Sequence, residues 1–128
     1  MSAFSQYAFT SLLAPEQCGY GGRLFGRAFD PSELLGDHCW QVSGELRYDL
    51  PTLVNLLTNA QIYAFTDKGK VYTIAPAVGT AASVTGASAG GGVRLNWQNY
   101  LSADLSAVKA IEGPRNDWRF FFITTARY

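Results

Sequence analysis

The sequence predicts an all-β domain built as an antiparallel meander of about six strands. Three observations lead to this class. Apolar and polar residues alternate with period two in several segments, turn residues separate those segments, and almost no segment has the 3.6-residue period of an amphipathic helix. Strands that follow one another through short turns pair as antiparallel hairpins. At 128 residues, the chain is one domain or a piece of a larger one.

The composition indicates that many outward positions do not face water. Charged residues make up 16% of the chain, against roughly 25% in an average soluble domain, while 14% of the residues are aromatic. Basic and acidic residues balance at 10 each, so no charge excess favours nucleic acid as a partner. No apolar run reaches the roughly 18 residues of a transmembrane helix. Residues 1–17 lack the basic and apolar regions of a secretory signal peptide.

The clearest strand covers residues 39–48. Its apolar and polar residues fall on opposite faces, Trp40, Val42, Leu46 and Tyr48 against Gln41, Ser43, Glu45 and Arg47. One face therefore favours an apolar medium, and the other favours water or polar partners.

Alternation predicts five further strands, at residues 4–10, 60–66, 85–97, 100–109 and 118–128.

Several of these strands carry features that bear on packing. Gly90 and Gly92 leave the polar face of the strand at 85–97 open, which makes room for bulky groups. We expect a turn at residues 52–58, a bend at 68–70 and a two-residue hairpin loop at 98–99.

A long glycine-rich connection, residues 19–38, follows the first strand and contains GGRLFGRAFDPSELLGD at 21–37. Connections longer than about 12 to 15 residues are uncommon in compact domains and are usually functional or disordered. Within it, residues 32–35 can form a single helical turn. We expect the loop to fold back onto another part of the chain.

Two cysteines, Cys18 and Cys39, bracket this loop. Their spacing matches no metal site, and two are too few for a disulfide framework. We expect two free, semi-buried thiols. The alternative is a bridge between them in an oxidising compartment, which needs Cα atoms within roughly 7 Å.

The sequence contains no recognisable catalytic constellation. It has no nucleophile–base pair, no phosphate-binding loop and no metal-ligand cluster, and its single histidine, His38, has no partner for acid–base chemistry. We therefore expect no enzyme activity, no metal and no cofactor.

Two architectures share the alternation, a soluble sandwich and a membrane barrel. The strands approach the roughly 9 to 11 residues that cross a bilayer at a tilt. Aromatic residues stand at the ends of the apolar faces, namely Trp40, Tyr48, Trp97, Trp118 and Tyr128. These features favour the barrel. The alternative is a small soluble β-sheet domain that acts as a binding module.

Four motifs occur in order: GGRLFGRAFDPSELLGDH at residues 21–38, SGELRYDLP at 43–51, YAFTDKGKV at 63–71 and a closing aromatic strand. Together they resemble the C-terminal end of the outer-membrane transporters of two-partner secretion, the haemolysin secretion/activation proteins of the Omp85 superfamily. The resemblance implies the last strands of a sixteen-stranded barrel in the outer membrane of a Gram-negative bacterium. In that family, the barrel exports a large haemolysin- or adhesin-like partner protein.

The resemblance also implies a latch. In the family, a long loop folds into the barrel lumen, and the arginine of its Arg-Gly-aromatic tip pairs with the aspartate of a Phe-x-Asp-x-Gly motif. By position the tip falls on Arg27, Ala28 and Phe29, with Ala28 where glycine is usual. The second motif falls on Phe65, Asp67 and Gly69. We expect Arg27, Phe29 and Asp67 to form the latch, supported by Gly22, Gly26, Phe65 and Gly69.

Further roles follow from the same resemblance. The charged residues expected to line the lumen as a mutually satisfied set are Glu45, Arg47, Arg94 and Asp104. Phe120, Phe122 and Tyr128 would form the C-terminal signal that the barrel-assembly machinery reads, with Tyr in place of the usual Phe.

Six strands cannot close a sixteen-stranded barrel, and bare sheet edges are not viable in lipid. We therefore expect residues 1–128 to be an incomplete barrel segment that is not competent alone. The expected partners are a secreted protein, outer-membrane lipid and the assembly machinery, with no nucleic acid.

Overall fold

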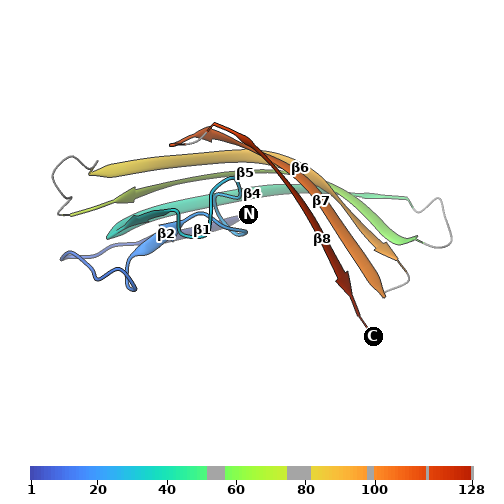
Figure 1. The fold of residues 1–128 in the computed structure, drawn as a ribbon, viewed down its shortest axis with the longest axis horizontal. Coiled ribbons are helices and arrows are strands. Elements are labelled where there is room, and N and C mark those ends of the chain that lie inside the picture. Colours follow the sequence, from blue (N-terminus) through green and yellow to red (C-terminus); the bar gives the residue numbers. More distant parts are fainter. Residues whose placement is uncertain (52–56, 75–81, 98–99, 115, 128) are drawn as a thin grey trace.

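The computed structural model describes residues 1–51, 57–74, 82–97, 100–114 and 116–127. Six strands form one antiparallel sheet in the order β1-β4-β5-β6-β7-β8, and the hairpin β2–β3 forms a second, small sheet (Figure 1). The strand bounds are β1 Ser2–Gln6, β2 Cys18–Tyr20, β3 Leu34–Gly36, β4 His38–Leu50, β5 Leu57–Tyr72, β6 Ser83–Trp97, β7 Leu101–Glu112 and β8 Trp118–Ala126. The predicted all-β meander is confirmed.

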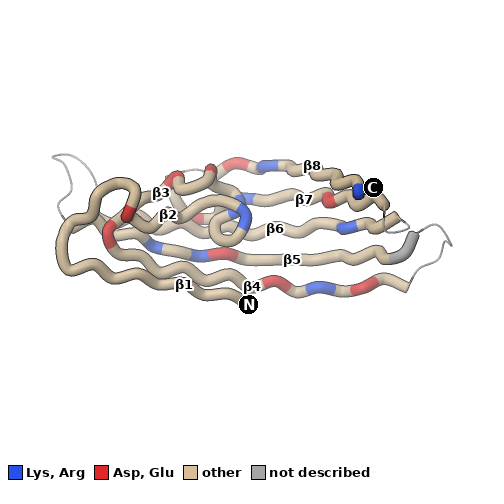
Figure 2. The backbone as a smooth tube through the Cα atoms, turned by 90° about the horizontal axis from the view of Figure 1, so that it is seen from below, with Lys and Arg blue, Asp and Glu red and all other residues tan. Residues whose placement is uncertain are grey.

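The large sheet curves into an arch, with β1 at one edge and β8 at the other. The connection between β1 and β4, which contains β2 and β3, lies under the concave side (Figures 1 and 2). No helix among the described residues is long and apolar enough to cross a membrane.

The first strand differs from its predicted bounds because its end is drawn away from the sheet. β1 ends at Gln6, whereas the prediction extended it to residue 10. The Ala8 N–H donates to His38 Nδ1 at 3.0 Å, and the Leu12 N–H donates to Asp37 Oδ1 at 2.7 Å. These bonds turn the chain across the end of the sheet.

Two other local predictions are wrong. The bend expected at residues 68–70 is absent, because β5 runs unbroken to Tyr72 and pairs with both β4 and β6 over this stretch. The helical turn expected at 32–35 is not formed. The Glu33 N–H donates to the Asp30 carbonyl in a turn, and β3 then begins at Leu34 and pairs with β2. The expected turn at 52–58 falls mainly on residues outside the described ranges, as does the hairpin loop at 98–99.

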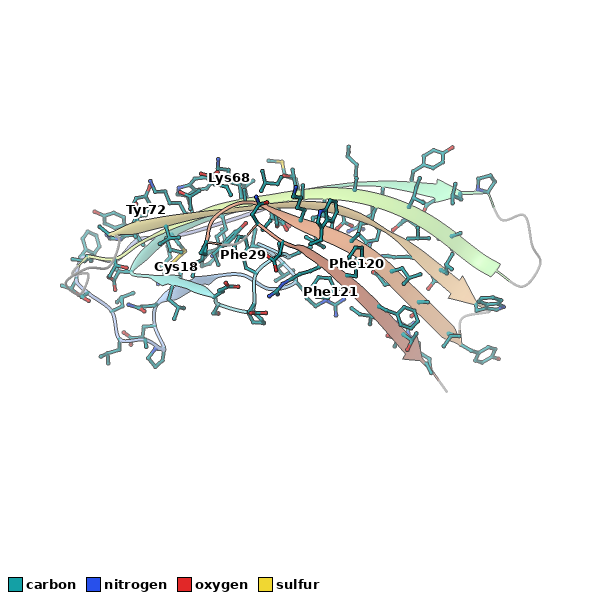
Figure 3. All side chains as sticks on the ribbon, turned by 45° about the horizontal axis from the view of Figure 1, so that its top comes forward. Cys18, Phe29, Lys68, Tyr72, Phe120 and Phe121 are labelled. Carbon is teal, nitrogen blue, oxygen red and sulfur yellow. A yellow bond between two sulfur atoms is a disulfide. The ribbon has the colours of Figure 1, made fainter. Side chains whose placement is uncertain are left out.

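Alternation gives the arch two chemically different faces. The convex face carries large apolar side chains that are exposed: Trp40, Leu46, Tyr48, Ile62, Trp97, Leu101, Leu105, Trp118, Phe120 and Phe122. Leu46 is 81% exposed and Phe120 78%. The concave face carries polar and charged side chains together with the docked loop. Lys68 stands on the convex side, while Cys18 and Phe29 lie under the concave side (Figure 3).

The contact between loop and sheet centres on Tyr20, which is fully buried. Its ring lies against Gly26 of the loop, Gly69 of β5 and Gly86 of β6, and a methyl group at any of the three would overlap it. Phe29 packs beside it, with ring centroids 5.5 Å apart. Three glycines therefore create the space in which one aromatic ring holds the loop against the sheet.

A disulfide joins Cys18 to Cys39, with Cα atoms 6.3 Å apart, so the expectation of free thiols is wrong. The cause is the small hairpin. Cys18 of β2 pairs opposite Gly36 of β3, and β3 leads almost directly into β4, which places Cys39 beside Cys18. Closing a loop of this length stabilises the fold by about 3 kcal/mol in the chain-entropy account.

Asp37 fixes the same end of the structure. It is buried, and its carboxylate accepts hydrogen bonds from the N–H groups of Leu12 at 2.7 Å and Ile74 at 2.8 Å, and from Gln17 Nε2 at 3.3 Å. The two backbone donors hold the pKa of Asp37 below its usual value. One carboxylate thus links the segment after β1, the start of β4 and the end of β5.

Filling the space beside Tyr20 should release the loop. We expect Gly86→Val to raise the protease susceptibility of residues 21–31 strongly, because its side chain would occupy the position of the Tyr20 ring. Gly44→Val is the matched control, since a Cβ there meets nothing within 4 Å. Equal susceptibility of the two variants would contradict the packing role of Tyr20.

Asp37 predicts a pH dependence. Because its folded-state pKa is lowered, its stabilisation is present above the unfolded-state pKa and is lost as the pH falls through the folded-state pKa. Asp37→Asn should speed hydrogen exchange of the amides at residues 12 and 74 at neutral pH, and the difference from the unchanged protein should vanish in acid. Asp49→Asn, at an exposed carboxylate, is the control. A difference that persists in acid would rule out this role.

Candidate functional site

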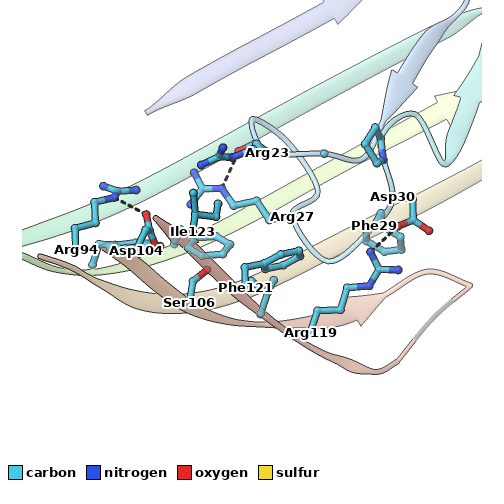
Figure 4. Close-up of a pocket in the computed structure, with 15 residues that line it drawn as sticks. Arg23, Arg27, Phe29, Asp30, Arg94, Asp104, Ser106, Arg119, Phe121 and Ile123 are labelled. Carbon is cyan, nitrogen blue, oxygen red and sulfur yellow. Dashed lines mark hydrogen bonds and ion pairs between the residues drawn. The ribbon is translucent and has the colours of Figure 1, made fainter. Parts of the chain in front are cut away.

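The tip of the loop, residues 22–31, reaches across the concave face of the sheet and covers its polar side chains. Figure 4 shows these residues opposite β7 and β8. A cavity of about 270 Å³ separates the tip from the sheet, and its lining includes Arg27, Phe29, Tyr63, Arg94, Asp104 and Phe121. The site is therefore an interface between a loop and a sheet face, with a small open space inside it.

Arg27 makes the principal contacts of the tip. Its Nη1 donates to Glu45 Oε2 at 2.8 Å, and its guanidinium carbon lies 3.9 Å from the centroid of the Phe65 ring. Its Nε donates to the Arg23 carbonyl at 3.1 Å and lies 3.9 Å from Asp67 Oδ2. The side chain is 20% exposed. The cation is thus held by one direct ion pair, a second, longer one and an aromatic face.

Asp67 lies closer to the backbone N–H of Arg27 than to the Arg27 guanidinium. The carboxylate is fully buried, and its Oδ2 accepts from the Arg27 N–H at 3.2 Å. Ser43 Oγ donates to Oδ1 at 2.6 Å, and Ser88 Oγ donates to Oδ2 at 3.2 Å. These two serines pair with Asp67 across β4 and β6. The buried charge is therefore satisfied by fixed donors on both neighbouring strands.

Glu45 is the shared acceptor of the site. Besides Arg27, it accepts from Arg47 Nε at 2.6 Å and from Arg94 Nη1 at 3.1 Å. Arg94 Nε continues to Asp104 Oδ2 at 3.0 Å. Four residues expected to line the lumen are thus brought into one network, and that network extends to the loop. Sequence reasoning placed Glu45 on the inward face but did not identify it as the main partner of Arg27.

The site contains two arginine–aromatic stacks, on neighbouring inward positions of β5. The guanidinium of Arg94 lies 3.9 Å from the centroid of the Tyr63 ring, just as that of Arg27 lies over Phe65. The two rings occupy the space above Gly92 and Gly90 of β6, where a Cβ would come within 3 Å of them. The open polar face expected at Gly90 and Gly92 is therefore filled by aromatic rings from the neighbouring strand.

A second ion pair holds the tip at the other side of the cavity. Arg119 Nη1 of β8 donates to Asp30 Oδ1 at 2.8 Å, and Figure 4 shows the two side chains meeting. The sequence motifs did not point to this pair. Its only sequence signal is the inward position of Arg119 in the alternation of the last strand.

The remaining predicted residues of the tip have structural roles. Gly22 and Gly26 have φ values of 111° and 69°, in the region that favours glycine. Ala28, at the position where the family usually has glycine, is fully buried and has no positive φ. Phe29 is buried, and its ring fits against Gly113 beyond β7.

Chemically, the arrangement can hold a loop or let it go. The carboxylates of the site accept hydrogen bonds from arginine and serine side chains, and Asp104 Oδ1 also accepts one from the Tyr63 hydroxyl at 2.7 Å. Within the described ranges, no group of histidine, cysteine and acidic residues has the arrangement of a metal site. The contacts of the tip are ionic and reversible, whereas its base is covalently tied.

A double-mutant cycle can measure the Arg27–Glu45 contact. We expect Arg27→Ala and Glu45→Gln to be non-additive by about 1 to 3 kcal/mol in the opening free energy of the loop, measured by native-state hydrogen exchange. The matched pair is Arg47→Ala with Glu45→Gln, where the Arg47 side chain is 59% exposed and the coupling should stay below about 1 kcal/mol. Additivity of the first pair would show that Glu45 does not hold the tip.

Comparison with known proteins identifies a family for this chain. Residues 1–94 match the family described as haemolysin secretion/activation protein ShlB/FhaC/HecB. The matched part is more than half of the chain and contains the loop, Arg27, Glu45 and Asp67. No curated protein and no solved structure matched the chain. The chain belongs to the haemolysin secretion/activation family, the outer-membrane transporters of two-partner secretion in Gram-negative bacteria.

Proposed function

We propose that this chain forms the C-terminal wall of an outer-membrane barrel that exports a large haemolysin- or adhesin-like partner, and that its loop latches inside the lumen. One observation carries the proposal: Arg27, at the loop tip, pairs with Glu45 and stacks on Phe65 beside buried Asp67, all on the concave face. A loop anchored on that face occupies space that an exported chain would need.

The two faces of the sheet support the barrel orientation. The exposed apolar side chains of the convex face suit contact with outer-membrane lipid, while the concave face carries the charged network and suits a water-filled lumen. A soluble binding module would instead expose this large apolar surface to water, where contiguous patches of this kind are rare.

The open edges support a segment that acts only with further strands. Among the described residues, β1 pairs only with β4, and β8 pairs only with β7. Unpaired backbone groups at such edges cannot be satisfied in lipid. In our proposal, additional strands pair with both edges and close the barrel, and the chain is not competent without them.

The latch works by holding or freeing the loop. Breaking a buried ion pair by removing one partner costs roughly 3 to 5 kcal/mol, because the other charge is left unpaired. Here Arg47 and Arg94 remain on Glu45, so the cost of releasing Arg27 falls below that range. A latch of this strength keeps the loop in place at rest and allows its displacement during export.

The last strand is proposed to carry the assembly signal. Phe120 and Phe122 project from the convex face and are exposed, on a strand with one free edge. Tyr128, the third residue of the expected signal, lies outside the described residues. An exposed aromatic pair on a free edge strand is accessible to the barrel-assembly machinery.

Secretion tests the latch directly. Arg27→Ala, tested in the barrel closed by the additional strands, should reduce export of the partner protein severalfold while the barrel stays inserted, as judged by detergent-dependent extraction and heat-modifiable migration. Arg23→Ala is the matched control, because it removes an exposed arginine of the same loop. Unchanged secretion by Arg27→Ala would refute the latch. A monodisperse monomer without detergent would refute the barrel itself and favour the soluble module.

A further inference from the structure

Lysine and arginine are segregated between the two faces of the sheet. All three lysines of the chain, Lys68, Lys70 and Lys109, lie on strands that bound β6. Lys68 and Lys70 alternate with inward-facing Asp67 and Gly69, and Lys109 lies between buried Val108 and Ala110, so all three face the convex side. The arginines of the strands, Arg47, Arg94 and Arg119, face the concave side.

The lysines stand where the apolar surface of the convex face ends. On β5, Lys68 follows Ile62, Ala64 and Thr66 on the same face, and on β7, Lys109 follows Leu105 and Ala107. Aromatic rings lie at this level. Lys70 Nζ is 4.8 Å from the Tyr72 ring centroid, and Lys109 Nζ is 5.6 Å from that of Trp118. Lysine and aromatic residues at the limit of an apolar surface mark the level of lipid headgroups.

An apolar hollow lies on the convex face next to the lysine-bearing part of β7. It has a volume of about 360 Å³, and its lining includes Gly91, Leu105, Ala107, Phe120 and Phe122. Gly91, Ala107 and Phe120 pair across β6, β7 and β8. Because the first two are small, the hollow lies between the larger side chains around it. Lys109 is the next outward residue of β7 after Ala107, so a cation stands at one end of an apolar depression.

The charge of this region favours an anion. Lys68 Nζ pairs with Glu112 Oε2 at 3.0 Å, across the small side chain of Ala87 on β6. Lys70 and Lys109 contact aromatic rings, so the four charged groups carry a net positive charge of two. β5 and β7 flank β6, which sets the lysine-bearing strands about 10 Å apart laterally. Along β6, Lys109 lies opposite Ala89, whereas Lys68 and Lys70 lie opposite Ala87 and Thr85. Flexible ammonium groups at that separation can converge on one phosphate.

We propose that the convex face holds a phosphate-bearing lipid, with its headgroup phosphate at Lys68, Lys70 and Lys109 and one acyl chain in the hollow. The inference rests on the proposed orientation of the convex face toward lipid, and it adds the headgroup class and the position of the chain. Lysine suits the role because its compact charge on a long apolar stem reaches a phosphate from an apolar surface.

The test uses the barrel closed by the additional strands, purified in detergent and titrated with phosphatidylglycerol or with phosphatidylcholine of the same acyl chains. Binding is followed by native mass spectrometry. The unchanged protein should bind phosphatidylglycerol more tightly. Lys68→Gln, Lys70→Gln and Lys109→Gln should each weaken that binding about fivefold and leave phosphatidylcholine unaffected. Glu112→Gln should tighten it. Ala107→Phe, which fills the hollow, should weaken both lipids.

The control and the opposing outcomes are distinct. Arg23→Gln removes one positive charge from the concave side and should leave lipid binding unchanged. Equal affinity for the two lipids, lysine variants that bind like the unchanged protein, or full competition by inorganic phosphate would each overturn the lipid site. Each of these outcomes can occur while the protein still depends on detergent and still shows heat-modifiable migration. None of them therefore contradicts the barrel proposal. Loss of those two properties in the unchanged protein would instead refute the barrel.

Discussion

The guanidinium of Arg27 is the interaction on which the organisation of the concave face depends. A cation on a loop that folds over a sheet loses much of its water, and only a matched set of acceptors offsets that loss. Here Glu45 supplies the charge, Phe65 supplies an aromatic face, and Asp67 binds the adjacent backbone N–H. Arginines and carboxylates of the neighbouring strands already form an ion-pair network around Glu45, and Arg27 of the loop joins that network.

The second constraint is steric. A loop can reach acceptors on a sheet only if the sheet leaves room, and the strands do so through glycine. Gly69 and Gly86 receive the Tyr20 ring, while Gly90 and Gly92 let Phe65 and Tyr63 lie flat beneath the arginines. Without these flat rings, the guanidinium groups would have no surface to stack on. Glycine in these strands therefore serves the electrostatics, although glycine ordinarily weakens a strand.

Period-two alternation was enough to predict the strands and the two faces of the sheet, because side-chain direction in a strand depends only on position. The short turns between strands predicted their order. It was not enough for features that arise where segments meet. The disulfide depends on the pairing of β2 with β3, and both strands are only three residues long. β5 runs unbroken through Gly69 because it pairs there with both β4 and β6, and the Tyr20 ring lies against this glycine. Alternation also placed Glu45 correctly on the inward face. Only the path of the loop shows that the Arg27 guanidinium lies closer to Glu45 than to Asp67.

The disulfide at the base of the loop affects how fast a displaced loop tip returns to the sheet. The Cys18–Cys39 bridge and the buried Asp37 fix both ends of the segment that carries Arg27. A displaced tip therefore remains close to Glu45 and Asp67, at an effective concentration on the order of millimolar. Rebinding is then intramolecular and independent of protein concentration. In the proposed latch, the disulfide therefore shortens each opening, unless an exported segment occupies the position of the tip.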